Sequence, residues 1–251
     1  MWGIFREKAK SIFGRESSAG KPWSGMPDPE TVKEVRAEVA KNGARIPLHL
    51  PLEGIRFVSL DLETTGFSCG AGDEIIAVGA VAVQGGQVRK EDGFHRFIYP
   101  YRLVPGKVVE LTGIGPDMLV GCPSFLGVLP ALLEYIGDSI IVGHAVNFDL
   151  NFINAKLKKY FGVKLRNRAV DTSVLAKALH PGWDDYSLDS LLAFYGLEPQ
   201  GRHSAAGDAL LTALVFLRLL AGLKEYGVCT FAELEHFVRS RQDFACRPDH
   251  L

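Results

Sequence analysis

The sequence is short of cysteine, of long apolar runs and of net charge, and each shortage excludes a class of protein. Its four cysteines form no Cys-x-x-Cys pair, so they predict neither a zinc knuckle nor a disulfide framework and favour a reducing, cytoplasmic setting. No run of about 18 or more apolar residues is present, and the N-terminus has no apolar stretch followed by a small-residue cleavage site. We therefore expect neither a transmembrane segment nor a secretion signal.

The charge balance limits how the chain can meet a nucleic acid. With 28 basic and 29 acidic residues the formal net charge is -1, so the molecule as a whole offers no bulk attraction for a polyanion and any such contact must be local. Hydrophobic residues make up 47% and charged residues 23% of the 251 positions, which is the balance of an ordinary globular protein. This length predicts one well-buried domain with an appendage.

Residues 1–53 differ in texture from the rest and are predicted to be an N-terminal extension, partly flexible or helical. A Gly/Ser/Pro-rich piece runs from Ser17 to Pro29, and a helical pattern follows from Asp28 to Asn42. Near the start, four apolar residues fall at helical spacing beside basic ones: Trp2, Phe5, Ala9 and Ile12. This pattern suits a membrane surface or a partner groove, and equally a frayed leader.

Residues 54–225 are predicted to form an α/β domain with a mixed central β-sheet flanked by α-helices. Alternating and apolar runs predict strands at 56–63, 74–84, 93–99, 139–142 and 169–171, the first three in succession as a meander. Helical patterns lie near Asp117 and at 124–136, 147–161, 172–179, 187–195 and 205–223. Residues 226–251 are predicted to hold a peripheral helix, at 230–240, and a tail.

Asp61 and Glu63 are the first candidates for chemistry. They stand two apart in a strand, so their side chains point to the same face, just before the strand ends at Thr64. Two acids on one face of a mostly apolar strand repel each other and resist burial, unless a divalent cation lies between them. A solvated strand end with two surface acids is the competing interpretation, and a bare Asp-x-Glu pattern indicates it more often than a metal site.

Three further residues are weak signals when each is taken alone. Asp149 lies in the first turn of a predicted helix, where the helix dipole favours an acid. His203 and Asp208 stand five apart at the start of the apolar helix 205–223. The small residues 204–207 allow close packing of this helix on a sheet, which leaves Asp208 on the packed side and His203 on the entering loop. A lone histidine at this place is usually a surface residue or a cap.

The three segments together carry more information than any of them alone. DLETTG, GHAVNFDLNFI and RHSAAGDALLT occur in this order within residues 55–222. In this the chain resembles the DEDDh 3′→5′ exonuclease family, which includes the proofreading (epsilon) subunit of bacterial DNA polymerase III, ribonuclease T and oligoribonuclease. The resemblance does not cover the residues before Ile55.

The resemblance implies a ribonuclease H-like fold and a two-metal-ion phosphodiester hydrolysis that releases nucleoside 5′-monophosphates from a 3′ end. The family's metal-binding carboxylates fall on Asp61, Glu63, Asp149 and Asp208, which would hold two Mg²⁺ or Mn²⁺ ions. His203 falls on the family's general base, a role that suits an imidazole near neutral pH. DNA is favoured over RNA as the substrate, with single-stranded or frayed ends, in proofreading or repair.

The resemblance also places contacts to the terminal nucleotides. Glu63 and the Thr64 backbone would meet the 3′-hydroxyl, and Leu111–Ile114 resembles the family's apolar wedge, which stacks on the last bases. The expected substrate-binding residues are Leu62, Thr64, Thr65, Ile114, His144 and Phe148. Ala145 stands where many relatives carry Asn. Asp171-Thr172 also matches a frequent family position, and we interpret it as a strand-to-helix capping pair and not as a metal ligand.

Other functions remain open at this point. One alternative is a 3′→5′ exoribonuclease of the ribonuclease T or oligoribonuclease type; another is a non-catalytic nucleic-acid-binding adaptor that keeps the fold. A third combines catalysis with docking onto a polymerase or another protein partner through residues 1–53. The sequence does not decide between DNA and RNA, between proofreading and repair, or between the two metals, and it does not give the oligomeric state.

Overall fold

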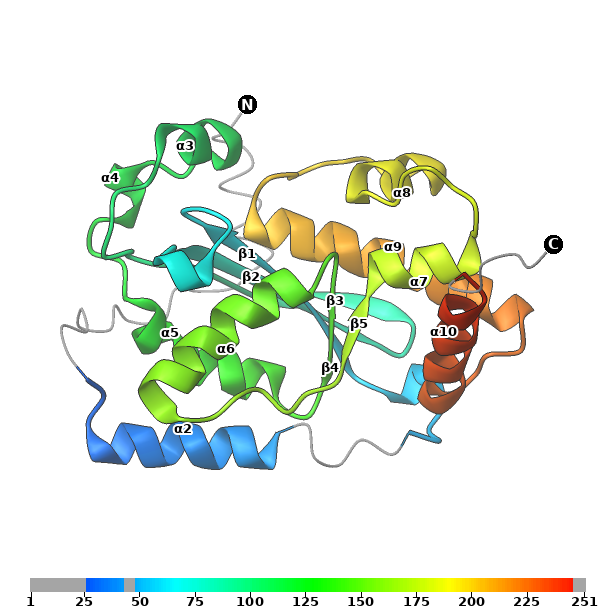
Figure 1. The fold of residues 1–251 in the computed structure, drawn as a ribbon, viewed down its shortest axis with the longest axis horizontal. Coiled ribbons are helices and arrows are strands. Elements are labelled where there is room, and N and C mark those ends of the chain that lie inside the picture. The colour runs from blue at the N-terminus through cyan, green and yellow to red at the C-terminus, as the bar shows by residue number, and fades with distance from the viewer. Residues whose placement is uncertain (1–25, 43–47, 246–251) are drawn as a thin grey trace.

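A computed structural model describes residues 26–42 and 48–245, with side chains up to Arg241. The apolar pattern predicted between Trp2 and Ile12 lies outside these residues. Within them, the chain folds into one mixed sheet with helices on both faces (Figure 1). The predicted α/β architecture is confirmed.

The sheet has five strands in the order β3-β2-β1-β4-β5. Their bounds are β1 Phe57–Thr64, β2 Ile75–Gln84, β3 Gln87–Phe97, β4 Ile140–Gly143 and β5 Ala169–Asp171. The first three pair antiparallel as the predicted meander, while β4 pairs parallel to β1 and β5 parallel to β4.

The predicted start of the third strand at Gly93 was wrong, because β3 already begins at Gln87. Gly85 and Gly86 both take positive φ, +62° and +71°, which forms a tight turn and returns the chain at once along β2. The first half of β3 is a polar edge strand with exposed side chains, so it lacks the apolar pattern that reveals a buried strand.

The helices of the described residues cover both faces of the sheet. Their bounds are α2 Pro29–Lys41, α3 Gly106–Thr112, α4 Pro116–Leu119, α5 Phe125–Ile136, α6 Asn147–Phe161, α7 Thr172–Leu179, α8 Leu188–Phe194, α9 Ala205–Glu225 and α10 Phe231–Ala245. Short 3₁₀ turns stand at Leu52–Gly54 and Cys69–Ala71. Helices α2, α5 and α6 pack on one face, and α7, α8, α9 and α10 on the other (Figure 1).

Strand β1 shows how the two faces differ. Val58, Leu60 and Leu62 point into the apolar cluster under α5 and α6. The alternate residues of β1 point toward α9, beginning with Phe57, whose ring meets that of Phe216. Asp61 and Glu63 stand on this second face, so both acids are directed toward the first turn of α9.

Helix α9 is the central helix of the second face. It is long and apolar enough to cross a membrane by length and composition, yet 61% of its most apolar window is buried inside the protein, as in a core helix. Its N-terminal end lies very close to β2, because a Cβ at Gly79 would stand 2.2 Å from the backbone of Ala205. Only glycine permits this approach.

Part of the predicted N-terminal extension packs on the domain. Val35 and Val39 of α2 are buried in the cluster formed with α5 and α6. Arg36 Nε donates to the carbonyl of Phe161 at 2.7 Å, and Asn42 Nδ2 donates to that of Leu133 at 3.0 Å. The predicted helix at 28–42 is thus confirmed, and it packs against α5 and α6.

Candidate active site

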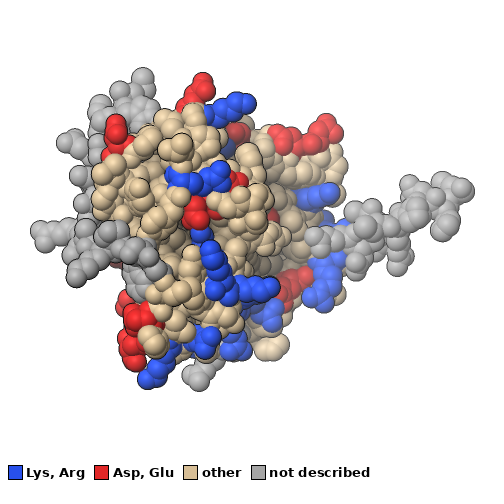
Figure 2. All heavy atoms as spheres, turned by 60° about the vertical axis from the view of Figure 1, so that its left-hand side comes forward, with Lys and Arg blue, Asp and Glu red and all other residues tan. Residues whose placement is uncertain are grey.

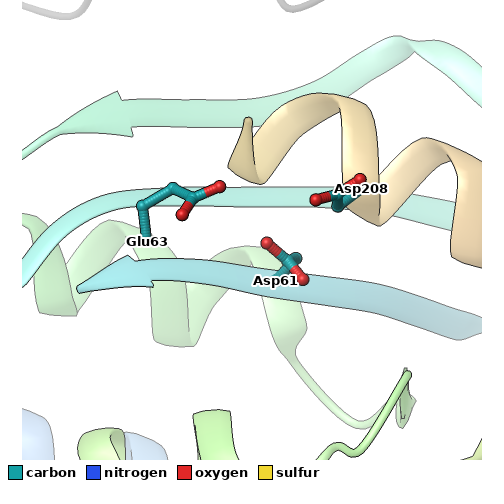
Figure 3. Close-up of side chains that lie close together, drawn as sticks. All are labelled: Asp61, Glu63 and Asp208. Atoms are coloured by element: carbon teal, nitrogen blue, oxygen red, sulfur yellow. The ribbon is translucent and has the colours of Figure 1, made fainter. Parts of the chain in front are cut away.

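Three carboxylates meet where β1 faces α9. Asp61 and Glu63 come from β1, and Asp208 comes from the first turn of α9. One ligand oxygen from each lies within 4.8 Å of the others, and the three side chains converge on one point (Figure 3). The same-face geometry predicted for Asp61 and Glu63 therefore continues onto a second element that lies far along the chain.

Asp149 reaches the same place from the opposite side of β1. It lies in the first turn of α6, is 3% exposed, and its Oδ1 accepts a hydrogen bond from the backbone N–H of Leu62 at 2.9 Å. This contact fixes the carboxyl between the positions of Asp61 and Glu63. All four predicted carboxylates are thus brought together, three in one cluster and the fourth bound to the strand that carries two of them.

Small residues bring Asp208 into position. Ser204 caps α9 by accepting from the N–H of Gly207, and a Cβ at Gly207 would lie 1.9 Å from the carbonyl oxygen of Gly201. Ala205 and Ala206 are both buried against the sheet. The close packing predicted from residues 204–207 is confirmed, and it places the first turn of α9 directly over β1 and β2.

His203 stands on the loop that enters α9, as predicted. It has a positive φ of +61°, a conformation in which non-glycine residues are uncommon, and its side chain is exposed. Its backbone N–H donates to Asp208 Oδ2 at 3.1 Å. The imidazole is therefore carried at the edge of the acidic cluster, within the solvent.

Burial makes the four acids hard to ionise without a cation. It is the largest cause that raises the pKa of Asp61, of Asp149 and of Asp208, and it raises the pKa of Glu63 to about 8. Repulsion among the acids adds to the effect at Asp61, where Asp149 is the strongest neighbour. A cluster of carboxylate oxygens fits Mg²⁺ or Mn²⁺ well, because both ions prefer hard oxygen ligands.

Arg202 also belongs to this site, although it was not among the residues predicted from the sequence. Its Nη1 donates to Asp208 Oδ1 at 2.6 Å, and its other nitrogens bind Asp189 on α8. A basic residue next to the predicted general base was the available signal. Its partner Asp189 stands 13 residues away across a loop, so the bridge itself is a property of the fold.

Two of the predicted substrate-binding residues lie at the end of β1 and at the start of the loop that follows it. Thr64 Oγ1 donates to the carbonyl of Gly66 at 2.6 Å. Thr65 is buried, donates to Asp73 Oδ1 at 3.2 Å and accepts from the N–H of Glu74 at 3.0 Å. Thr65 thus fixes the shape of the loop, while Thr64 is partly open beside the acids. The side chain of Leu62 points into the core on the other face. Leu62 contacts the site through its backbone N–H, which donates a hydrogen bond to Asp149.

The remaining predicted substrate-binding residues lie in different surroundings. His144 is half-buried and its Nδ1 lies 3.0 Å from Thr172 Oγ1. Phe148 packs on Phe152 and lies beside Phe67, which is 91% exposed. Ile114 is 3% exposed in an apolar cluster, so the exposed apolar side chain of the predicted wedge is Leu111.

Asp171 has the capping role predicted for it. Its Oδ1 accepts from the N–H of Ser173 at 2.9 Å and so caps α7. Its carboxylate also accepts from the N–H groups of Ala145 and Val146, at 3.2 and 3.0 Å. Asp171 therefore holds the turn that leads into Asp149, with Ala145 at a positive φ of +56°.

The sequence matches a family model and several curated proteins. The model described as Exonuclease matches residues 58–216. The DNA polymerase III subunit epsilon of Aquifex aeolicus is 40% identical over 186 residues, which cover 74% of this chain and 91% of that protein. The PolC-type DNA polymerase III of Thermotoga maritima is 41% identical over 194 residues, which cover 77% of this chain but 14% of that much longer protein.

Solved structures share the fold at low sequence identity. Exonuclease X, solved with a 5′-overhanging duplex DNA, superposes with a TM-score of 0.56 at 21% identity and covers 73% of this chain and 99% of its own. The nuclease domain of 3′hExo, described as a DEDDh family member bound to rAMP, gives 0.60 at 17% identity, covering 68% and 94%. The predicted ribonuclease H-like fold is confirmed by these two structures.

Proposed function

The chain belongs to the exonuclease family, as a 3′→5′ exonuclease of the DEDDh type, and from this premise we propose that it removes nucleotides from the 3′ end of DNA by a two-metal-ion mechanism. The observation that carries the proposal is the convergence of Asp61, Glu63 and Asp208 within 4.8 Å, with Asp149 bound to the strand between the first two. Burial raises the pKa of all four acids. Their burial is costly for the fold unless a cation binds between them.

The carboxylates are the residues that would hold the divalent ions. Bound there, such ions supply an activated water and stabilise charge on the scissile phosphate. The chain itself contributes rigidity: β1 fixes Asp61 and Glu63, the Leu62 N–H orients Asp149, and the capped first turn of α9 orients Asp208. Little rearrangement is then needed during the reaction.

His203 is proposed as the general base. Its place on the loop beside Asp208 leaves the imidazole exposed, where it can approach a substrate that enters the site. The backbone N–H of His203 is already used by Asp208, which ties the loop to the acidic cluster. The imidazole then takes the proton of the attacking water and passes it to solvent.

The surroundings of the site favour a single-stranded or frayed end. Phe67 is exposed beside Phe148, so its ring offers an apolar face to a base, and stacking of this kind tolerates any base. Basic and acidic side chains are mixed over the face shown in Figure 2. With a net charge of -1, the proposed attraction for the phosphates is local.

The names of the relatives support DNA as the substrate and a role in replication or repair. The matched proteins are named as a DNA polymerase III subunit and as PolC-type DNA polymerases, and in the latter the matched region is 14% of one long chain. We therefore propose that this exonuclease works beside a polymerase. Residues 1–53 are the proposed docking element; because α2 packs into the core, deletion of residues 1–25 alone should weaken capture of the polymerase while sparing exonuclease activity.

The test is digestion of 5′-labelled single-stranded DNA and RNA with Mg²⁺ or EDTA. Wild type is expected to give a metal-dependent ladder that shortens from the 3′ end, faster on DNA, and an Asp61→Ala/Glu63→Ala variant is expected to give none. Glu53→Ala is the matched control, because it removes an exposed acid paired with Lys224 far from the cluster. A ladder on RNA alone would favour the exoribonuclease alternative, and no ladder on either substrate would sink the proposal.

A further inference from the structure

Arg202 bridges the acidic cluster to the surface of α8. Nη1 donates to Asp208 Oδ1 at 2.6 Å, while Nε and Nη2 donate to the two oxygens of Asp189 at 2.7 and 3.1 Å. The side chain of Asp208 is 9% exposed, that of Arg202 is 19% exposed and that of Asp189 is 62% exposed. One guanidinium therefore binds a buried acid at one end and a solvated acid at the other.

Arg202 supplies part of the positive charge that a metal ion would bring to the carboxylates. It lowers the pKa of Asp61, Glu63 and Asp208, against the larger rise that burial causes in each. Both oxygens of Asp208 are engaged within the chain, Oδ1 by Arg202 and Oδ2 by the N–H of His203. A divalent ion that binds Asp208 must therefore share it with a guanidinium, and two cations on one buried carboxylate repel each other.

We propose that Arg202 is a tethered counter-cation, which holds Asp208 in the metal-free protein, competes with the divalent ion for that carboxylate and rests on Asp189 when the ion displaces it. The inference rests on the proposed function, because it requires the ion to bind Asp208. The fork of two hydrogen bonds to Asp189 keeps the guanidinium in place after Asp208 lets go. Arg202 is thus a positioning residue that acts on metal loading.

Substitutions of Arg202 and of Asp189 are expected to change the affinity for the metal ion in opposite directions. Mn²⁺ binding to the full chain, without nucleic acid, is measured by titration calorimetry, and thermal unfolding is followed in EDTA. Arg202→Gln is expected to bind Mn²⁺ about ten-fold tighter and to unfold at a lower temperature in EDTA. Asp189→Asn leaves the guanidinium to Asp208 alone and is expected to bind Mn²⁺ about three-fold more weakly.

A purely structural role for Arg202 predicts that Arg202→Gln binds Mn²⁺ no tighter than wild type, and that result would overturn the proposal. Arg102→Gln is the matched control for charge, because Arg102 pairs with Asp73 on the loop after β1. If Arg102→Gln tightens binding as much as Arg202→Gln does, general charge explains the effect and the competition fails. Arg202→Lys, which keeps the charge without the fork, is expected to lie between wild type and Arg202→Gln.

A double variant tests whether Asp189 acts through Arg202. Once Arg202 is Gln, adding Asp189→Asn is expected to leave the Mn²⁺ affinity unchanged within about two-fold. A full three-fold loss in that background would show that Asp189 acts on the ion directly and would contradict the resting role. If wild type binds no Mn²⁺ at all, the proposed function fails first and takes this inference with it; binding by wild type without tightening in Arg202→Gln sinks the inference alone.

Discussion

The two faces of the sheet use the same strands for different purposes. Under α5 and α6, β1 contributes Val58, Leu60 and Leu62 to a continuous apolar cluster. Toward α9 the same strand contributes Phe57 at one end and two acids, Asp61 and Glu63, at the other. The first face is mainly apolar and contributes one acid, Asp149 of α6, while the second gives up part of its core to the other three.

The difference is made possible by close packing at the N-terminal end of α9. Large apolar side chains separate sheet and helix on the first face, whereas Gly79, Ala205 and Ala206 leave almost no side chain between β2 and α9. The backbone of α9 can therefore bring Asp208 within reach of two acids on β1. Precision at the site comes from contacts between backbones, which cannot adjust as flexible side chains do.

The largest expected effect comes from breaking this close approach with Gly79→Ala. Its new Cβ would lie 2.2 Å from the backbone of Ala205, so the start of α9 must move away from the sheet and carry Asp208 with it. A shift of this kind is expected to lower kcat/KM about 100-fold and to destabilise the fold by about 1–3 kcal/mol. Single-turnover digestion and urea unfolding measure the two effects.

Gly222→Ala is the matched control, because it lies on the same helix and its Cβ would meet Leu179 at an ordinary 3.6 Å. It is expected to keep full activity and to gain slightly in helix stability. Equal losses in both glycine variants would mean that α9 tolerates no added methyl anywhere, and the argument from close approach to the sheet would fail.

The second effect is a pH dependence on the α9 side of the sheet. His95 lies opposite Gly79 in β3, and burial, with a smaller contribution from Arg96, lowers its pKa to about 4. The unfolded histidine takes up a proton near pH 6.5, so between that pH and about 4 the unfolded state binds the extra proton. Stability contributed by neutral His95 is therefore full above about pH 6.5 and is lost as the pH falls through this window, by roughly 2–3 kcal/mol.

His95→Phe removes this titration and keeps a ring next to Phe97. The variant is expected to lose less stability than wild type between pH 7 and pH 4.5, as measured by urea unfolding at each pH. Parallel stability curves for the two proteins would show that His95 does not titrate with a depressed pKa.

Much of the fold follows from local patterns in the sequence. The predicted bounds of α6, β5 and α7 match the structure. Helices α6 and α7 have an apolar helical period, and Asp171 marks the step from β5 to α7 as its N-cap. Helix α3 was not predicted separately, and the first half of β3 was missed. These are a short helix and a polar edge strand, whose residues bury little, so their conformation is decided by neighbours and turns and not by an apolar period.

The site was predictable to the extent that its residues lie in contiguous motifs. Asp61 and Glu63 share one strand face, and the small residues before Asp208 indicated its close packing. Nothing local predicts that Ile114 is buried in an apolar cluster while Leu111 stays exposed. The Arg202 bridge to Asp189 and the approach of Gly79 to Ala205 depend on how distant segments fold together.

The smallest expected effect tests the apolar face, through Val39→Ala in α2. Val39 is 2% exposed in the cluster with α5 and α6, so loss of two methyl groups is expected to cost about 1–2 kcal/mol of stability. Because α2 itself carries none of the four acids, kcat/KM per folded molecule should stay at the wild-type value. Val120→Ala, at a position 72% exposed, is the control and should change neither quantity. A loss of kcat/KM in Val39→Ala beyond the folded fraction would mean that α2 positions the site as well, and the division of labour between the faces would be wrong.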